Sequence, residues 1–112
     1  MEKLKIDPSE KDLMKQVSEW LTLMRIFFWR NNTGAIKTER GGFYHFGYKG
    51  SPDYICIIKG LFIGIELKGP NGEQSDSQKE FEKRLSKAGG IYILARSLNE
   101  IIQILRNLNL IK

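Results

Sequence analysis

The spacing of apolar residues predicts a helix near the start of the chain. Apolar side chains recur there every three or four residues and define one buried stripe: Leu13, Met14, Val17, Trp20, Leu21 and Met24. Asp7 can cap this helix, Pro8 suits its first turn, and Glu10 stands three residues after the cap. We therefore expect an amphipathic first helix that begins at this capping box.

Further along the chain, the pattern alternates between strand-like and helix-like periods. The segment Arg30–Pro52 is rich in Gly, Lys, Arg and aromatic residues, and we expect one ragged strand between loops there. The other elements are predicted as strands over 26–29, 53–59, 61–68 and 91–95, and as helices over 75–88 and 97–108. Ser75 and Ser97 are candidate caps of the two helices. The order α-β-β-β-β-α-β-α predicts an α/β fold, with a small mixed sheet flanked by helices.

Length and composition limit the class of protein. The 112 residues are enough for one domain, and 41% apolar with 28% charged residues is typical of a folded globular chain. A net charge of +5 favours an anionic partner, most often nucleic acid, although a mildly basic protein without such a partner has the same composition. The single cysteine, Cys56, lies between two isoleucines and is expected to pack rather than react. No apolar run has membrane-spanning length and "MEKLKIDPSE" lacks the apolar core of a signal peptide, so we expect no membrane partner and a cytoplasmic location.

The central hairpin places three charged side chains on one face. A two-residue turn at Lys59–Gly60 would pair Ile58 with Leu61 and Asp53 with Glu66. The β-carbons of that acidic pair would then lie about 4.5–5.5 Å apart. Lys68 follows two residues later on the same face. This register needs a primed turn, in which Lys59 adopts a positive φ.

Like charges opposite each other destabilise a sheet, so the acidic pair needs a reason. A divalent cation is one, because Mg²⁺ prefers oxygen ligands and is usually held by one or two carboxylates with water and substrate phosphate. Lys68 beside it could position a water or stabilise charge on the phosphate. Gly64 on that face would leave room for a ligand. The alternative is a solvated outer face on which Lys68 neutralises Glu66.

These residues also match a known family pattern. Pro52-Asp53, twelve residues and then Glu66-Leu67-Lys68 resemble the signature of the PD-(D/E)XK nuclease superfamily. The wider strings "WRNNTG", "FGYKGSPDYICII", "GIELKGPNGEQSDSQKEF" and "AGGIYILARSLNEI" resemble a stand-alone VRR-NUC domain of the phage and bacterial type. The resemblance covers about Glu10–Leu105. It implies that residues 1–112 form a single VRR-NUC nuclease domain with a restriction-endonuclease-like core, active with Mg²⁺ or Mn²⁺.

The resemblance also implies a site. Asp53, Glu66 and Lys68 carry over directly, Gln78 matches a glutamine on the following helix, and a first-helix glutamate completes the set. Glu10 fits that role because it shares the apolar stripe, whereas Glu19 turns to the opposite side of the helix. The metal ligands would be Asp53, Glu66 and Glu10. Both Gln78 and Glu10 have an alternative role as members of helix capping boxes, Gln78 with Ser75 and Glu10 with the N-cap described above.

Cations and aromatic rings alternate ahead of the motif, a composition that suits phosphates and bases. Some of these rings are alternatively strand core. The candidate nucleic-acid contacts are Arg30, Asn31, Asn32, Lys37, Arg40, Tyr44, His45, Tyr48, Lys49 and Ser51. The resemblance implies a homodimer that hydrolyses phosphodiester bonds in branched DNA such as a four-way Holliday junction, in recombination or repair. The alternatives are a non-catalytic nucleic-acid-binding module and a structural partner of a phage replication or repair protein.

Overall fold

A four-stranded sheet forms the centre of the molecule, which is a computed structural model that describes residues 10–112. The strand order is β1-β4-β5-β6, with antiparallel pairing of β1 to β4 and of β4 to β5, and parallel pairing of β5 to β6. These strands are β1 (Phe27–Arg30), β4 (Tyr54–Ile58), β5 (Leu61–Leu67) and β6 (Ile91–Ala95). The predicted α/β class, with a small mixed sheet flanked by helices, is therefore confirmed.

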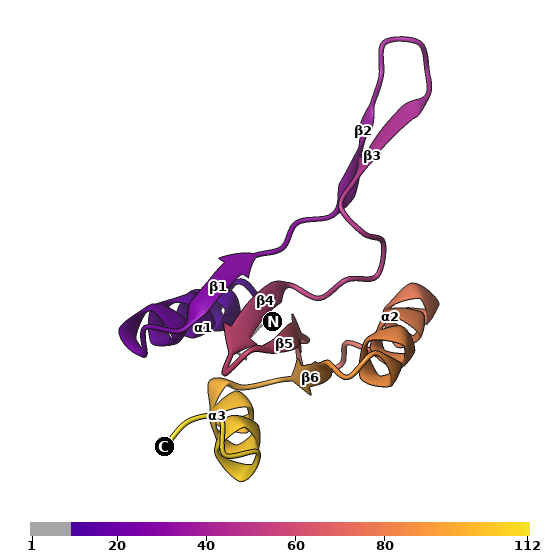
Figure 1. Cartoon of the computed structure of the whole chain (residues 1–112). Coiled ribbons are helices and arrows are strands. Elements are labelled where there is room, and N and C mark those ends of the chain that lie inside the picture. Colours follow the sequence, from indigo (N-terminus) through magenta and orange to yellow (C-terminus); the bar gives the residue numbers. More distant parts are fainter. Residues whose placement is uncertain (1–9) are drawn as a thin grey trace.

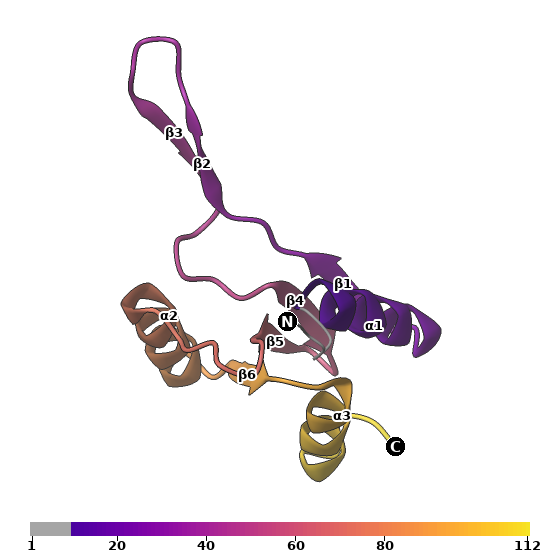
Figure 2. The ribbon, with the colours of Figure 1, turned by 180° about the vertical axis from the view of Figure 1, so that it is seen from behind.

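Within the described part of the chain, three helices flank the sheet: α1 (Glu10–Leu23), α2 (Asp76–Lys87) and α3 (Leu98–Asn107). The buried core lies between one sheet face and the helices α1 and α3, and includes Leu13 and Val17 of α1 with Ile101 and Leu105 of α3. The helix α2 links the parallel strands β5 and β6 and lies on the other side of the sheet (Figures 1 and 2). It contributes no fully buried residue. This side of the sheet therefore keeps polar groups near the surface.

The first helix agrees with the prediction along most of its length. Leu13, Val17 and Leu21 are buried, but Met24 is 41% exposed because the helix has already ended. Arg25 has a φ of 58°, and the Ile26 N–H donates to the Leu21 carbonyl at 3.0 Å, which is the geometry of a Schellman cap. The predicted N-terminal cap involves Asp7 and Pro8, which lie outside the described residues.

The central hairpin has the predicted register. Ile58 pairs with Leu61 and Tyr54 with Ile65, and the turn residues Lys59 and Gly60 have φ values of 52° and 80°. Two positive φ values at the turn define the primed type that matches the right-handed twist of the strands. Glu66 therefore faces away from Ile65 and away from the main core.

The segment between β1 and β4 differs from the prediction. In place of one ragged strand it forms a hairpin of its own, β2 (Gly34–Lys37) paired with β3 (Phe43–Phe46), which projects from the body (Figure 1). The chain reverses at Gly41, whose φ of 86° is readily available only to glycine. The order of elements is therefore α-β-β-β-β-β-α-β-α, with one strand more than expected.

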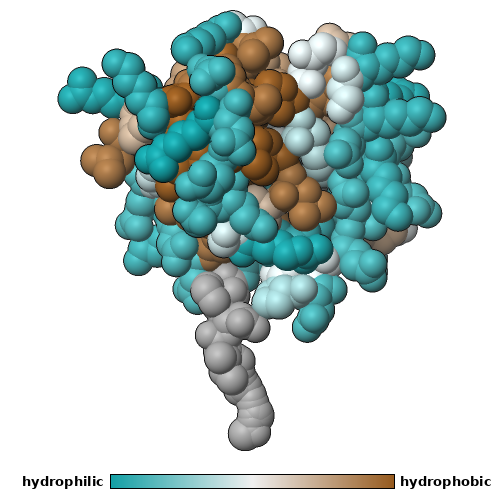
Figure 3. All heavy atoms as spheres, turned by 90° about the horizontal axis from the view of Figure 1, so that it is seen from below, coloured by the Kyte–Doolittle hydropathy of each residue, from teal (hydrophilic) through white to brown (hydrophobic). Residues whose placement is uncertain are grey.

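Apolar side chains also reach the surface. Seen from below, they gather in a central band bordered by polar residues (Figure 3). At the end of α1 and along β1, Leu23, Phe27 and Trp29 are 78%, 68% and 44% exposed. None of the helices in residues 10–112 combines the length and the apolar character needed to cross a bilayer.

Candidate active site beside the central hairpin

The Pro-Asp pair is held in place by the neighbouring strand. Pro52 is fully buried and packs on Gly64, where an added Cβ would stand only 2.6 Å from the Pro52 Cγ. The room that we expected Gly64 to leave for a ligand is therefore filled by Pro52. This contact matters because it fixes the residue immediately before Asp53.

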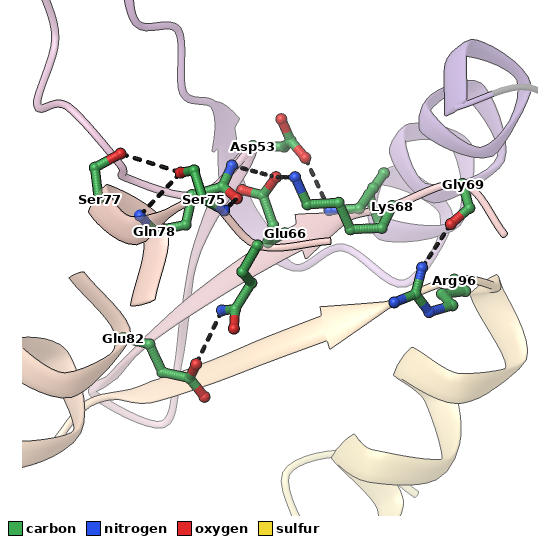
Figure 4. Close-up of polar contacts among 11 residues, drawn as sticks. Asp53, Glu66, Lys68, Gly69, Ser75, Ser77, Gln78, Glu82 and Arg96 are labelled. Carbon is green, nitrogen blue, oxygen red and sulfur yellow. Dashed lines mark hydrogen bonds and ion pairs between the residues drawn. The ribbon is translucent and has the colours of Figure 1, made fainter. Parts of the chain in front are cut away.

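Asp53 is anchored immediately before β4. Its Oδ2 accepts a hydrogen bond of 2.8 Å from the Leu67 backbone N–H, and its carbonyl accepts one of 2.7 Å from the Asn31 N–H. One carboxylate oxygen is thus used to fix the side chain against β5. The carboxylate points toward Glu66 and Lys68 (Figure 4).

Glu66 is the only charged residue with a buried side chain in residues 10–112, at 3% exposure. The pKa of its carboxyl is raised from an ordinary 4.5 to about 7, mainly by burial and then by the nearby Asp53 carboxylate, while Lys68 opposes the shift. The Lys68 Nζ lies 3.5 Å from the Glu66 Oε2. The charges of Asp53, Glu66 and Lys68 therefore act on one another, as the hairpin register predicted.

Lys68 extends from the end of β5 into this cluster. Its side chain is 14% exposed, and its backbone N–H donates to the Ala95 carbonyl at 3.0 Å, which continues the pairing with β6. The loop that follows packs over its aliphatic part, since a Cβ on Gly72 would lie 3.3 Å from the Lys68 Cδ. The ammonium group is thus held near the carboxylates by packing along its chain.

The structure places Gln78 both in the capping box of α2 and in contact with Glu66, whereas its catalytic role stays a prediction. Its Oε1 accepts from the Ser75 N–H at 2.9 Å and its own N–H donates to the Ser75 Oγ at 3.2 Å, which completes the capping box of α2. Its Nε2 donates to the Glu66 Oε2 at 3.1 Å (Figure 4). One amide therefore caps the helix and contacts the buried carboxylate.

Glu10 begins α1 and is exposed, so it does not share the buried position of the apolar stripe. Its charge nevertheless contributes to the raised pKa of Glu66, which places it within electrostatic reach of the site. Glu19, the other glutamate of this helix, is exposed and borders a shallow hollow with Ser18 and Thr22.

The donor set fits a hard divalent cation in part. Among the described residues, internal contacts reach Oδ2 of Asp53 and Oε2 of Glu66, which leaves the second oxygen of each carboxylate for other ligands. Two carboxylates completed by water and phosphate are a common arrangement for Mg²⁺. Residues 10–112 contain no group of three or more His, Cys, Asp and Glu side chains arranged to hold a metal ion.

Three polar residues near the site were not singled out from the sequence. Gln74 donates to Glu82 at 2.9 Å, and Tyr92 lies opposite Gly64, on the sheet face that carries Glu66. Burial raises the pKa of Tyr92 to about 12, while the neighbouring Gln74 opposes this shift. By distance and angle, however, the buried hydroxyl has no hydrogen-bond partner in the part of the chain that the structure describes. Tyr92 was missed because the strand pairing that brings it beside Gly64 is not visible in the sequence.

Several candidate nucleic-acid contacts hold the loop before Asp53. Asn31 donates to the Ser51 Oγ at 2.7 Å and to the Pro52 carbonyl at 3.0 Å, and Ser51 donates to the Tyr48 carbonyl at 2.6 Å. The Tyr48 ring packs edge-on against Phe81 of α2, with 5.4 Å between centroids. These groups are used within the chain, although Tyr48 remains 57% exposed.

The other candidates lie nearer the surface. Arg30 stands over the Tyr54 ring, with its guanidinium carbon 5.7 Å from the centroid, and the Asn32 carbonyl packs closely on Gly47. Lys37, Arg40, Tyr44, His45 and Lys49 are all exposed in or beside the β2–β3 hairpin. Their contact with nucleic acid stays a prediction.

Comparison with known proteins agrees with this architecture. The fold of this chain is similar to that of a solved structure described as a "VRR_NUC domain protein". The two superpose with a TM-score of 0.61 and 20% sequence identity, covering 98% of this chain and 93% of the other. No protein-family model and no curated protein matches the sequence. The likeness shows that the chain has the fold of that VRR_NUC domain protein.

Proposed function

We propose that this protein is a metal-dependent nuclease that hydrolyses phosphodiester bonds. The observation that carries the proposal is the buried Glu66 carboxylate, in contact with Lys68 and Gln78 and electrostatically coupled to Asp53. Burying a carboxylate costs free energy even when it is paired, and buried carboxylates with a raised pKa are concentrated at functional sites. The fold shared with a VRR_NUC domain protein supports the same reading.

Asp53 and Glu66 are the residues that would hold Mg²⁺ or Mn²⁺, and Glu10, whose charge acts on Glu66, is proposed to assist through water. A bound cation would neutralise charge that develops on the phosphate. Glu66 must lose its proton to act as a ligand, and the raised pKa makes this step dependent on pH near neutrality.

Lys68 is the residue proposed to orient the attacking water. Its ammonium group is tethered near Glu66 and donates hydrogen bonds only, so it can hold a water oxygen or stabilise a phosphate oxygen. Gln78 keeps the Glu66 carboxylate in place through its amide N–H. These three side chains come from β5 and α2, which packing and capping hold rigid.

The proposed substrate is branched DNA, such as a four-way junction, cut by a homodimer in host-cell cytoplasm during recombination or repair of phage or bacterial DNA. The net positive charge supports a polyanionic substrate. Two sites related by a two-fold axis suit symmetric cuts. The exposed Leu23, Phe27 and Trp29 offer apolar surface for a second copy.

The test is cleavage of labelled four-way junction, flap and duplex DNA in Mg²⁺, Mn²⁺ or EDTA. We expect cleavage with a divalent cation, none in EDTA, and loss of at least about a hundredfold in rate for Lys68→Ala. Lys83→Ala, which removes an exposed lysine of α2, is the matched control and should cut like the wild type. Absence of cleavage with Mn²⁺ despite DNA binding would show a non-catalytic binding module instead.

A further inference from the structure

The β2–β3 hairpin has two chemically different faces. Paired residues share a face, so Ala35 and His45 lie on the same side as Lys37 and Phe43, and we call these four residues the basic face. The opposite side, which we call the apolar face, carries Gly34, Ile36, Tyr44 and Phe46. Neither strand pairs with the main sheet.

Both faces of this hairpin are open to solvent. Ile36, Phe43 and Tyr44 are 58%, 62% and 63% exposed, and the hairpin stands clear of the body in both ribbon views (Figures 1 and 2). A two-stranded ribbon alone is at best marginally stable in water. Exposed rings on such a ribbon are typical of a binding surface.

Charge indicates which kind of partner this ribbon fits. Between residues 34 and 49 the chain carries three cations, Lys37, Arg40 and Lys49, against one carboxylate, Glu39. Cations attract phosphates without reading bases, and exposed rings give stacking platforms. A two-stranded ribbon also has the dimensions to enter the major groove of a duplex.

A cavity lies at the base of the hairpin. It has a volume of about 280 Å³, and its lining includes Thr33, Ala35, His45, Gly47 and Lys49. The lining takes Ala35 and His45 from the basic face and Gly34 and Phe46 from the apolar face, with Lys49 just beyond β3. A lysine ammonium and an imidazole beside such a hollow provide hydrogen-bond donors suited to an anionic oxygen.

The two legs of the hairpin meet beside the acidic site. The Asn31 N–H on the outgoing leg donates to the Asp53 carbonyl at 2.7 Å, and the Asn31 side chain bonds the Pro52 carbonyl on the returning leg. Gly47 packs so closely on the first leg that an added Cβ would lie 2.4 Å from the Asn32 carbonyl oxygen. The legs of the hairpin are therefore tied to the backbone around Asp53, so a strand that follows them from the hairpin would lead toward this residue.

We propose that the β2–β3 hairpin is a nucleic-acid arm that binds through its basic face. The backbone of the strand leading to the cleavage site lies along Lys37, and one of its phosphates occupies the cavity between His45 and Lys49. The inference rests on the proposed function for its substrate, but the arm is tested by binding alone. Of the apolar face, Gly34 and Phe46 border this cavity, whereas Ile36 and Tyr44 take no part in the contact.

The experiment compares binding of labelled four-way junction and duplex DNA in EDTA, at several salt concentrations, by fluorescence anisotropy. For Lys37→Ala/Lys49→Ala we expect affinity at least about tenfold weaker and a plot of log K against log salt that is shallower by about two. The matched control is Lys83→Ala/Lys87→Ala on α2, which removes the same charge and should bind as the wild type does. Ile36→Thr on the apolar face should also bind normally.

Two outcomes would overturn the proposal that the hairpin is a nucleic-acid arm. If both double variants weaken binding equally, only net charge matters and the basic face is not a site. If Ile36→Thr is the variant that weakens binding, and it also lowers the mass measured by sedimentation, the hairpin is a contact between two copies of the chain. Cleavage is measured separately with Mn²⁺: a wild type that binds through the basic face without cutting contradicts the nuclease and leaves the arm intact.

Discussion

The Gln78 side chain donates its amide N–H to the Glu66 carboxylate at 3.1 Å while its oxygen caps the helix α2. The beginning of a surface helix is thereby fixed against the one buried charge of the described chain. Two substitutions separate the two functions of this amide. Glutamate keeps the capping oxygen but loses the donor, whereas alanine loses both.

For Gln78→Glu we expect near-normal stability but strongly reduced cleavage, because a second carboxylate would face Glu66 and raise its pKa further. The pH at which cleavage is half-maximal should move upward. For Gln78→Ala we expect a loss of about 1 kcal/mol in the free energy of unfolding as well as reduced activity. Urea unfolding and a pH profile of cleavage check both variants. Equal activity of the glutamate variant and the wild type at every pH would contradict a role for this contact.

The buried Glu66 makes the stability of the metal-free protein depend on pH. Its pKa of about 7 in the folded chain lies above its ordinary 4.5, so the folded state binds the proton more tightly than the unfolded state. The contribution is fully present below pH 4.5 and is lost as pH rises through about 7, with an upper limit of roughly 3 kcal/mol. We expect the free energy of unfolding, measured with urea in EDTA, to fall between pH 5 and pH 8.

Glu66→Gln should remove most of this dependence, because the amide does not titrate. The exposed Glu73→Gln is the control and should retain it. Added Mn²⁺ should raise the melting temperature of the wild type more at pH 8 than at pH 5, because the cation competes with the proton. The same pH slope in both variants would show that another group is responsible.

Pro52 and Gly64 connect the stability of the sheet to the position of Asp53. A methyl group at residue 64 would stand 2.6 Å from the Pro52 ring, and the buried ring has little room to shift. We expect Gly64→Ala to lower the free energy of unfolding by about 1–3 kcal/mol and to reduce cleavage by displacing Asp53. Gly69→Ala, where an added Cβ meets nothing within 4 Å, is the matched glycine control. Chemical denaturation and cleavage rates are measured for both variants, and equal values for the two would contradict the role of the Pro52–Gly64 contact.

The candidate site could be predicted from the sequence where turn geometry and helix capping determine the position of its residues. Lys59–Gly60 fixed the register of the hairpin, and this register brought Asp53, Glu66 and Lys68 to one side. The capping pattern around Ser75 placed Gln78 at the start of α2, but it did not show that one amide could serve both the cap and Glu66.

Contacts between segments that are distant along the chain could not be predicted from the sequence. The packing of Pro52 on Gly64 and the pairing of Tyr92 with Gly64 depend on how β4, β5 and β6 assemble. The separate hairpin was missed because its strands are only four residues each and their exposure follows no alternation, so neither periodicity nor burial marks them.

Tyr92 carries a buried hydroxyl without a hydrogen-bond partner among residues 10–112. Removing an unpaired buried polar group spares its desolvation cost, so Tyr92→Phe should be as stable as the wild type or more stable by up to about 1 kcal/mol. Thermal unfolding in EDTA measures this effect. Gln74→Ala is the companion variant. It removes the polar neighbour that opposes the raised pKa of Tyr92, and it also removes the hydrogen bond that Gln74 donates to Glu82. A Tyr92→Phe protein that unfolds at clearly lower temperature would mean that the hydroxyl has a partner, such as an ordered water, in solution.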